Sequence, residues 1–406
     1  MSMPPPLQGI TVVDFSHVMA GPFCTHTLKT LGARVIKIER AGEGDVMRHY
    51  DTREEYKGTA PPFIAVNCGK ESIALDLKSE AGLGIAKQLL EKADVVVENF
   101  RPGVLDRLGL GYHENKATNP GVIYCSVSGF GKSGPMRDNP AYDHVVQAVS
   151  GVMSLTGEPG SKPTKVGFPV LDTFAGYTAA SAIVSAVLQR ERFGEGQYID
   201  VAMLDASLNL MIAMVAPYLI AGDIPKKVGN RGFNMSPTSD TFQAADSEIS
   251  IGANTQVQYE ALCKALDRED LIHDPRFAER EGRIKNEIAL RDEIESRTRE
   301  KPAEEWEIIF NKVSVPSAAV RTINDIANHP HVEQRPLKVS IDLPHNPLAK
   351  TLGPGFQLAN VPPESLGAAP QLGEHTRALL IELGYTNDSI DTLTEQGAIQ
   401  VGQSGT

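Results

Sequence analysis

A carboxylate ahead of an alanine-rich helical segment is the first group in the sequence that could do covalent chemistry. Asp172 lies in the stretch Gly167–Thr178, GFPVLDTFAGYT. Asp is a favoured helix N-cap, and capping alone explains it. The helix dipole and free N–H groups also favour an ionised carboxylate there, which could attack a thioester carbonyl. Gly167 and Gly176 would let a bulky thioester approach the backbone. The local sequence leaves both interpretations open.

Basic residues recur where predicted strands begin or end. Arg40 ends the second strand, Lys70 and Lys78 flank the third, and Arg101 and Arg107 follow the fourth. Each alone is typical of a solvated surface charge. Ligands of an open parallel sheet bind outside the carboxyl ends of its strands. The recurrence therefore indicates a phosphate site at that edge.

Two further patterns argue against other chemistries. Gly129–Gly134 (GFGKSG) matches G-x-G-x-x-G, but Pro135 and Asn139-Pro140 prevent the long helix that dinucleotide binding requires. The histidines form no metal motif, and His329 and His331 stand two apart in a proline-containing loop. The sequence therefore predicts neither a nicotinamide cofactor nor a metal site.

Composition places the chain among acidic globular proteins. It has 406 residues, 41% hydrophobic and 22% charged, with a formal net charge of -12. This charge argues against nucleic-acid and membrane-surface partners, although a local basic patch can still bind an anionic cofactor. The four cysteines form no CxxC pair, and the N-terminus MSMPPPLQGI has no secretory pattern. We expect a soluble, cytoplasmic protein.

The elements that must position these groups alternate between strand and helix. Apolar runs predict strands over 10–15, 33–40, 72–77, 94–100, 122–130 and 197–202. Helical segments are expected over 22–31, 80–92, 142–155, 173–190, 204–220 and 376–383. This order predicts an α/β fold with a mainly parallel sheet. A Gly/Asn/Pro-rich connector at 229–239 precedes a charged, mostly helical stretch, so we expect domains at 1–222, 223–325 and 326–406.

Motifs along residues 8–385 carry a family resemblance. They are Asp14–Pro22 (DFSHVMAGP), Leu31–Arg40 (LGARVIKIER), Gly42–Asp45 (GEGD), Ser72–Lys78 (SIALDLK), Glu98–Gly103 (ENFRPG), Leu105–Arg107 (LDR), Ser128–Gly131 (SGFG), Gly134-Pro135, Asp274–Phe277 (DPRF) and Leu372–Thr376 (LGEHT). In combination they resemble the family III CoA-transferases, the relatives of formyl-CoA transferase and carnitine CoA-transferase.

The resemblance implies a fold and a mechanism. The fold is a Rossmann-like large domain built from both chain ends, with a smaller inserted domain, and two chains interlock as a homodimer. Asp172 aligns with the catalytic aspartate, which favours the nucleophile over the cap. Its carboxylate attacks an acyl-CoA, and an aspartyl-CoA thioester then carries CoA to an acceptor acid. Coenzyme A is a cosubstrate, and no tightly bound cofactor is expected.

The resemblance also assigns binding residues. The implied CoA contacts are His17, Val18, Ala20, Arg40, Leu75, Lys78, Asn99, Phe100, Arg107, Tyr142 and Asp143, and the substrate residues are Met19, Arg231 and Gly232. Met19 stands where formyl-CoA transferase has Gln, and the consecutive glycines over its oxalate site are absent, which argues against oxalate or formate. Arg231 and His17 could hold a distal carboxylate, so we expect succinyl-CoA to donate to a small dicarboxylate.

Two other functions stay open. An α-methylacyl-CoA racemase needs an acid and a base on opposite faces of the substrate α-carbon. In that branch a His precedes the Asp at the positions filled here by Tyr142 and Asp143, and His144 is displaced by two residues. A non-catalytic acyl-CoA-binding protein is the other alternative, and the intact Asp172 argues against it.

Overall fold

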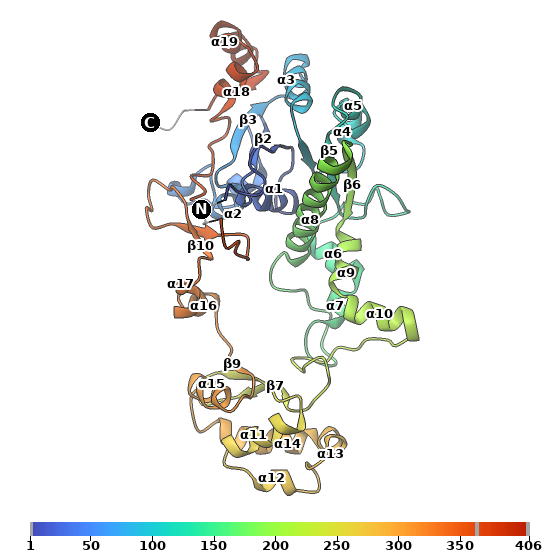
Figure 1. Ribbon diagram of the computed structural model, residues 1–406, viewed down its shortest axis with the longest axis vertical. Coiled ribbons are helices and arrows are strands. Elements are labelled where there is room, and N and C mark those ends of the chain that lie inside the picture. Colours follow the sequence, from blue (N-terminus) through green and yellow to red (C-terminus); the bar gives the residue numbers. More distant parts are fainter. Residues whose placement is uncertain (1–2, 362–364, 403–406) are drawn as a thin grey trace. The chain divides into compact units, whose positions relative to one another are not determined.

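A seven-stranded sheet organises the computed structural model, which describes residues 3–361 and 365–402 (Figure 1). Its strand order is β12-β3-β2-β1-β4-β5-β6. The bounds are β1 Thr11–Asp14, β2 Arg34–Arg40, β3 Glu71–Leu75, β4 Val95–Glu98, β5 Ile123–Ser128, β6 Gln197–Ala202 and β12 Ile399–Gln400. All neighbours pair in parallel except β12, which runs antiparallel to β3. The prediction of an α/β fold with a mainly parallel sheet is confirmed.

Helices cover both faces of this sheet because successive strand residues point to opposite sides. Val12 belongs to the core beneath α1 (Ala20–Thr30) and α8 (Val170–Phe193). Its neighbour Val13 belongs to a second core, which includes residues of α3 (Glu80–Glu91), α18 (Thr376–Glu382) and α19 (Asn387–Glu395). The strands are therefore buried on both sides, and their carboxyl ends are free to carry loops.

Helix α8 begins three residues before the predicted start. Pro169 occupies the N-cap position, and Asp172 is the third residue of the first turn. Asp172 is therefore not the N-cap, contrary to the capping interpretation. Among the described residues, α8 and the bent pair α9 (Met203–Leu210) and α10 (Ile212–Ala221) are long and apolar enough to cross a membrane. We interpret α8 as a core helix, because its buried alanines pack on the sheet.

Two long predicted helices are broken in the structure. The segment 142–155 divides into α6 (Asp143–Ser150) and α7 (Val152–Leu155), because Gly151 between them has a φ of 92°. The segment 204–220 divides at Met211 into α9 and α10, which meet at a bend of 82°. The remaining short elements here are η1 Val46–His49, η2 Glu54–Tyr56, α2 Pro61–Asn67, α4 Val104–Arg107 and α5 Tyr112–Thr118.

The chain forms two compact units. The first comprises the chain up to Met153, Lys165–Pro225 and the part from His331 onward, and the second comprises Ser154–Thr164 and Lys226–Pro330. The second unit contains an antiparallel sheet, β7 Ser239–Gln243, β8 Glu248–Gly252 and β9 Ser317–Ala319. Its helices are α11 Gln256–Ala265, α12 Asp270–His273, α13 Arg280–Lys285, α14 Glu287–Thr298, α15 Ala303–Lys312 and α16 Ile323–Ala327. The sequence predicted this stretch as mostly helical and missed the sheet, since short polar strands give little signal.

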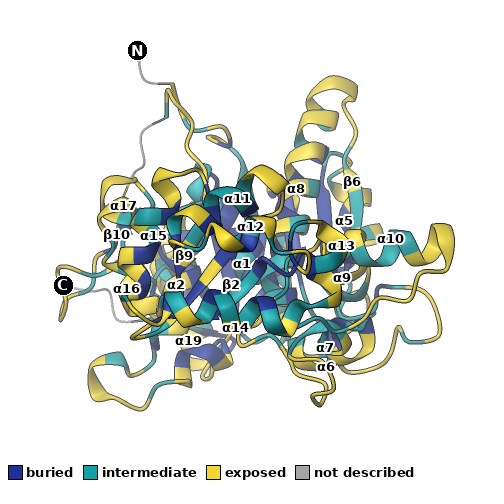
Figure 2. Cartoon of the chain, turned by 90° about the horizontal axis from the view of Figure 1, so that it is seen from below, coloured by how far each residue is buried: buried dark blue, intermediate teal, exposed yellow. Residues whose placement is uncertain are grey.

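Large apolar side chains remain exposed on the first unit. Helix α10 has no buried residue (Figure 2). Its residues Leu219 and Ile220 are 74% and 84% exposed. Leu188 and Phe193 near the end of α8 are also exposed. Exposed apolar patches of this kind mark interaction surfaces. The last elements of the chain before α18 are α17 Pro330–Gln334 and the hairpin strands β10 Lys338–Ser340 and β11 Lys350–Leu352.

Candidate active site

Three predicted CoA contacts meet at the carboxyl ends of β1 and β4. Because these strands are parallel neighbours, the residues after them lie at one edge of the sheet. Asn99 accepts a hydrogen bond from the His17 N–H (2.9 Å) and donates one to the His17 carbonyl (2.7 Å). The rings of His17 and Phe100 lie 5.0 Å apart. Burial lowers the pKa of His17, so its imidazole is neutral at pH 7.

Asp172 lies on the face of α8 that packs against α1. Residues four apart in a helix share a face, and Gly176 one turn later contacts the start of α1. A Cβ on Gly176 would lie 2.7 Å from the Ala20 carbonyl oxygen and 2.9 Å from the Phe23 ring. Gly176 therefore serves close helix packing and not thioester approach, whereas Gly167 is exposed with open space around it. Asp172 thus stands near the loop that carries His17.

Asp143 supplies the cap that Asp172 does not. Its carboxylate accepts hydrogen bonds from the N–H groups of Leu171 (2.8 Å) and Asp172 (3.2 Å). The Asp172 carboxylate itself has no hydrogen-bond partner among residues 3–361 and 365–402. Burial and, to a smaller extent, the negative charge of Asp143 together raise the pKa of Asp172 from 3.8 to about 7.

This environment corrects one expectation about Asp172. The helix dipole was expected to keep the carboxylate ionised at neutral pH. The structure instead gives a pKa of about 7, so about half of the carboxyl groups are protonated at pH 7. The physical reason is first the burial of Asp172 and second Asp143, which takes the first-turn N–H groups and adds a like charge. A carboxylate whose pKa lies near the working pH is ionised in a useful fraction of molecules and is more basic than an ordinary carboxylate.

Tyr50 is a residue near this site that the sequence did not single out. It follows η1 and is 57% exposed. Its pKa is raised by partial burial and by the charges of Asp45 and Asp172 and the phenol of Tyr142. These groups therefore lie close enough to Tyr50 in the first unit to influence its charge. No spacing pattern could have found it, because the loop after β2 brings it to Asp172 only in the fold.

Comparison with known proteins identifies the family of the chain. The model of CoA-transferase family III matches residues 7–376. The chain belongs to CoA-transferase family III. It is 39% identical to the acetyl-CoA:oxalate CoA-transferase of Acetobacter aceti, over 92% of this chain and 95% of that one. It is 37% identical to the succinyl-CoA:mesaconate CoA-transferase of Haloarcula hispanica, over 93% and 96% of the chains. The predicted family and the CoA-transferase activity are confirmed.

A solved structure from the same family shares the fold. It is a CAIB/BAIF family protein from Brucella suis, 34% identical, with a TM-score of 0.86. The match covers 94% of this chain and all of that one. The α/β architecture is therefore the family's own.

The basic residues at the sheet edge differ in their availability. Arg40 is exposed and pairs with Glu43 at 2.9 Å, and Lys78 and Arg107 are also exposed. Lys70 is not a surface charge, because it is fully buried and donates to Asp14 at 3.2 Å. A phosphate-binding role for Lys70 is therefore wrong. The four exposed basic residues Arg40, Lys78, Arg101 and Arg107 still follow the carboxyl ends of β2 to β4.

The other predicted contacts differ in their exposure to solvent. The Leu75 side chain is fully buried in the sheet core, so only its backbone could meet a ligand. Ala20 is buried at the start of α1, and Val18 and Met19 pack against a small cluster around Phe63. Tyr142 is 68% exposed. The role of each of these residues stays a prediction.

Arg231 and Gly232 lie in the second unit. Arg231 pairs with Glu287 at 2.9 Å, and a Cβ on Gly232 would collide with Ser239. One end of the Arg231 guanidinium is thus partnered within its own unit, while its Nε is buried without a hydrogen-bond partner among the described residues. An incoming carboxylate would have to share the guanidinium with Glu287.

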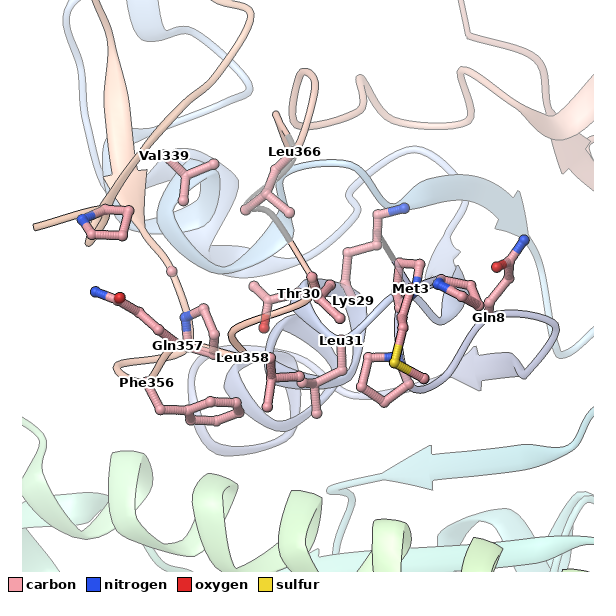
Figure 3. A pocket seen from close by; sticks show the side chains of 18 of the residues that line it. Met3, Gln8, Lys29, Thr30, Leu31, Val339, Phe356, Gln357, Leu358 and Leu366 are labelled. Atoms are coloured by element: carbon pink, nitrogen blue, oxygen red, sulfur yellow. The ribbon is translucent and has the colours of Figure 1, made fainter. Parts of the chain in front are cut away.

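A pocket of the first unit has a lining distinct from the predicted site residues (Figure 3). It has a volume of about 700 Å³ and lies between the N-terminal segment, the end of α1 and the region around Phe356. None of the predicted CoA or substrate residues lines it. Across the described parts of the chain, no group of His, Cys, Asp and Glu has an arrangement that could hold a metal ion.

Proposed function

We propose that this enzyme transfers CoA from succinyl-CoA to a small dicarboxylic acid through an aspartyl-CoA thioester on Asp172. The observation that carries the assignment of Asp172 is its environment. It is a carboxylate with a pKa of about 7, without a hydrogen-bond partner among the described residues, beside the His17 loop. A carboxylate that is only partly buried and bonds to no described residue is free to meet a substrate.

The chemistry would run in two symmetrical halves. Asp172 attacks the thioester carbonyl of the donor, giving a mixed anhydride and CoA thiolate. The thiolate attacks the aspartyl carbonyl, which releases the donor acid and leaves the aspartyl-CoA thioester. The acceptor carboxylate then reverses both steps, and one thioester replaces another without ATP.

The chain's own residues would hold the reactants in this sequence. His17, neutral and fixed through its backbone by Asn99, would lie beside the acyl group with Phe100. Arg40, Lys78 and Arg107 would meet the CoA phosphates as exposed cations at the sheet edge. Asp143 would hold the first turn of α8 and so fix the place of Asp172.

The substrate class is supported by a relative. The Haloarcula hispanica protein is named for succinyl-CoA and mesaconate. The Acetobacter aceti protein is named for acetyl-CoA and oxalate, so oxalate belongs in any test although Met19 argues against it. His17 of the first unit would meet a distal carboxylate, and Arg231 of the second unit is already paired with Glu287.

The assembly we propose is an interlocked cytoplasmic homodimer with a smaller inserted domain. The exposed apolar residues of α8 and α10 support it, because such surfaces are usually covered by a partner. No nucleic acid, membrane or tightly bound cofactor enters the proposal.

A matrix of acyl-CoA donors and carboxylic acceptors, read by mass spectrometry, tests the substrate assignment. Succinyl-CoA with mesaconate, glutarate and citramalate should give new thioesters, and acetyl-CoA with oxalate is the comparison arm. Transfer only from acetyl-CoA to oxalate would overturn the substrate proposal and leave the enzyme class intact.

A further inference from the structure

The loop between β1 and α1 contains a strained residue that no step of the transfer uses. Val18 has a φ of 63°, in the left-handed region. A β-branched side chain is disfavoured there, because its Cβ crowds the backbone. Val18 lies between His17 and Met19, so its backbone angles set the direction of both. Something in the surrounding structure must hold this conformation.

Asp45 holds it directly. The Val18 N–H lies 3.2 Å from each of the Asp45 carboxylate oxygens. The same carboxylate accepts from the Met47 N–H at 3.0 Å, at the start of η1. Both Val18 and the first turn after β2 are therefore tied to one buried group.

Lys37 balances the charge of Asp45 in the interior. Its ammonium lies 3.2 Å from an Asp45 oxygen and donates to the Ser16 carbonyl at 2.6 Å. The two side chains are each 1% exposed. Lys37 thus fixes the loop on the side of Ser16, while Asp45 fixes it at Val18.

A second buried pair keeps Asp45 in place. Glu39 accepts from the Asp45 N–H at 3.0 Å and pairs with Arg48 at 2.6 Å. Arg48 in turn donates to the Pro370 carbonyl at 2.9 Å. Asp45 is therefore fixed through its backbone as well as its side chain.

We propose that Asp45, seated on Lys37, is a positioning residue that holds Val18 in its left-handed conformation and thereby places His17 and Met19 for the acyl-CoA. The inference rests on the proposed contacts of these two residues. Asp45 does not touch the reacting atoms. Its effect should therefore appear mainly in the binding of the thioester.

The test compares Asp45→Asn with a matched control. The Asn side chain keeps its shape and one acceptor oxygen but loses the charge that pairs with Lys37. Releasing a strained left-handed residue should raise the KM for acyl-CoA about tenfold, with a smaller change in kcat. Asp94→Asn is the control, because Asp94 accepts from the Thr11 N–H (2.8 Å) at the opposite end of β1. It should lower Tm and leave KM unchanged.

Rescue by glycine separates positioning from general stability. Glycine adopts a φ of 63° without a Cβ penalty. In the Asp45→Asn background, Val18→Gly should therefore lower KM most of the way back to the KM of Val18→Gly alone. It should also restore part of the decrease in Tm. If Asp45→Asn folds poorly, Lys37→Met/Asp45→Asn removes both charges and carries the same comparison.

Three results decide the matter. Wild-type KM in Asp45→Asn, or an absence of glycine rescue in both KM and Tm, would overturn the inference. An unchanged KM in His17→Ala would instead count against the proposed CoA contacts. In that case the glycine rescue of Tm still reports whether Asp45 holds Val18.

Discussion

The pKa of Asp172 makes a quantitative prediction about the pH dependence of the first step. With a pKa of about 7, the carboxylate is about one-tenth ionised at pH 6 and about nine-tenths at pH 8. Only the ionised form attacks the thioester. The value of kcat/KM for the acyl-CoA donor should therefore rise about tenfold between these two pH values.

Replacing Asp143 tests the cause of that value. Asp143→Asn removes the like charge but keeps an oxygen that can accept from the Leu171 and Asp172 N–H groups. The pKa of Asp172 should fall, so the rise in kcat/KM should move to lower pH. Burial, the larger cause, is retained, and the pKa should remain above its ordinary value of 3.8.

Quench-flow measures this profile: the release of the donor acid in a single turnover is monitored at pH values from about 5 to 9. His144→Gln is a suitable control, because it changes an exposed neighbour and keeps both carboxylates. A wild-type profile that is flat down to about pH 5 would refute the reasoning. So would identical profiles for the wild type and Asp143→Asn.

Three further predictions concern stability. Asp172→Asn should abolish transfer and yet raise the free energy of unfolding at pH 8 by up to about 4 kcal/mol in urea titrations. The reason is that the raised pKa makes the wild type lose stability as pH rises from about 4 to 7; equal stabilities at pH 8 would contradict it. Lys70→Met should lower the free energy of unfolding by roughly 3–5 kcal/mol, because it leaves the buried Asp14 charge unpaired. Adding Asp14→Asn should recover much of this loss in the same urea titration. Gly176→Ala should lower the free energy of unfolding by roughly 1–3 kcal/mol and slow CoA transfer, because the added Cβ meets the α1 backbone. A wild-type Tm and a wild-type transfer rate would refute this packing argument.

Six of the seven strands of the large sheet were predictable from the sequence because they are short apolar runs between helical segments, whereas β12, with two residues, was missed. The run 197–202 coincides with β6, and the others differ from the structure by a few residues at their ends. The small sheet of the second unit was missed, since strands such as SDTFQ alternate weakly. The division of the helix 142–155 depends on Gly151, whose left-handed φ gives no periodic signal.

The proximity of some candidate site residues was predictable, and their electrostatics were not. Family motifs pointed to His17, Asn99 and Asp172, and parallel strand order explains why the first two meet. The pKa of Asp172 depends on Asp143, 29 residues earlier in the chain, and on burial. Neither follows from local sequence. The burial of Lys70 was not predicted for the same reason, because a charged side chain is normally expected to be exposed.

The central claim is that Asp172 becomes covalently bonded in every turnover, and oxygen transfer tests it most directly. The acceptor carboxylate attacks the aspartyl-CoA thioester, and breakdown of the resulting anhydride leaves one acceptor oxygen on Asp172. Turnover with an acceptor acid labelled with ¹⁸O, followed by peptide mapping, should therefore place ¹⁸O in the peptide that contains Asp172, and not in the Asp143 peptide. Continued CoA transfer with no ¹⁸O in the Asp172 peptide would contradict the account.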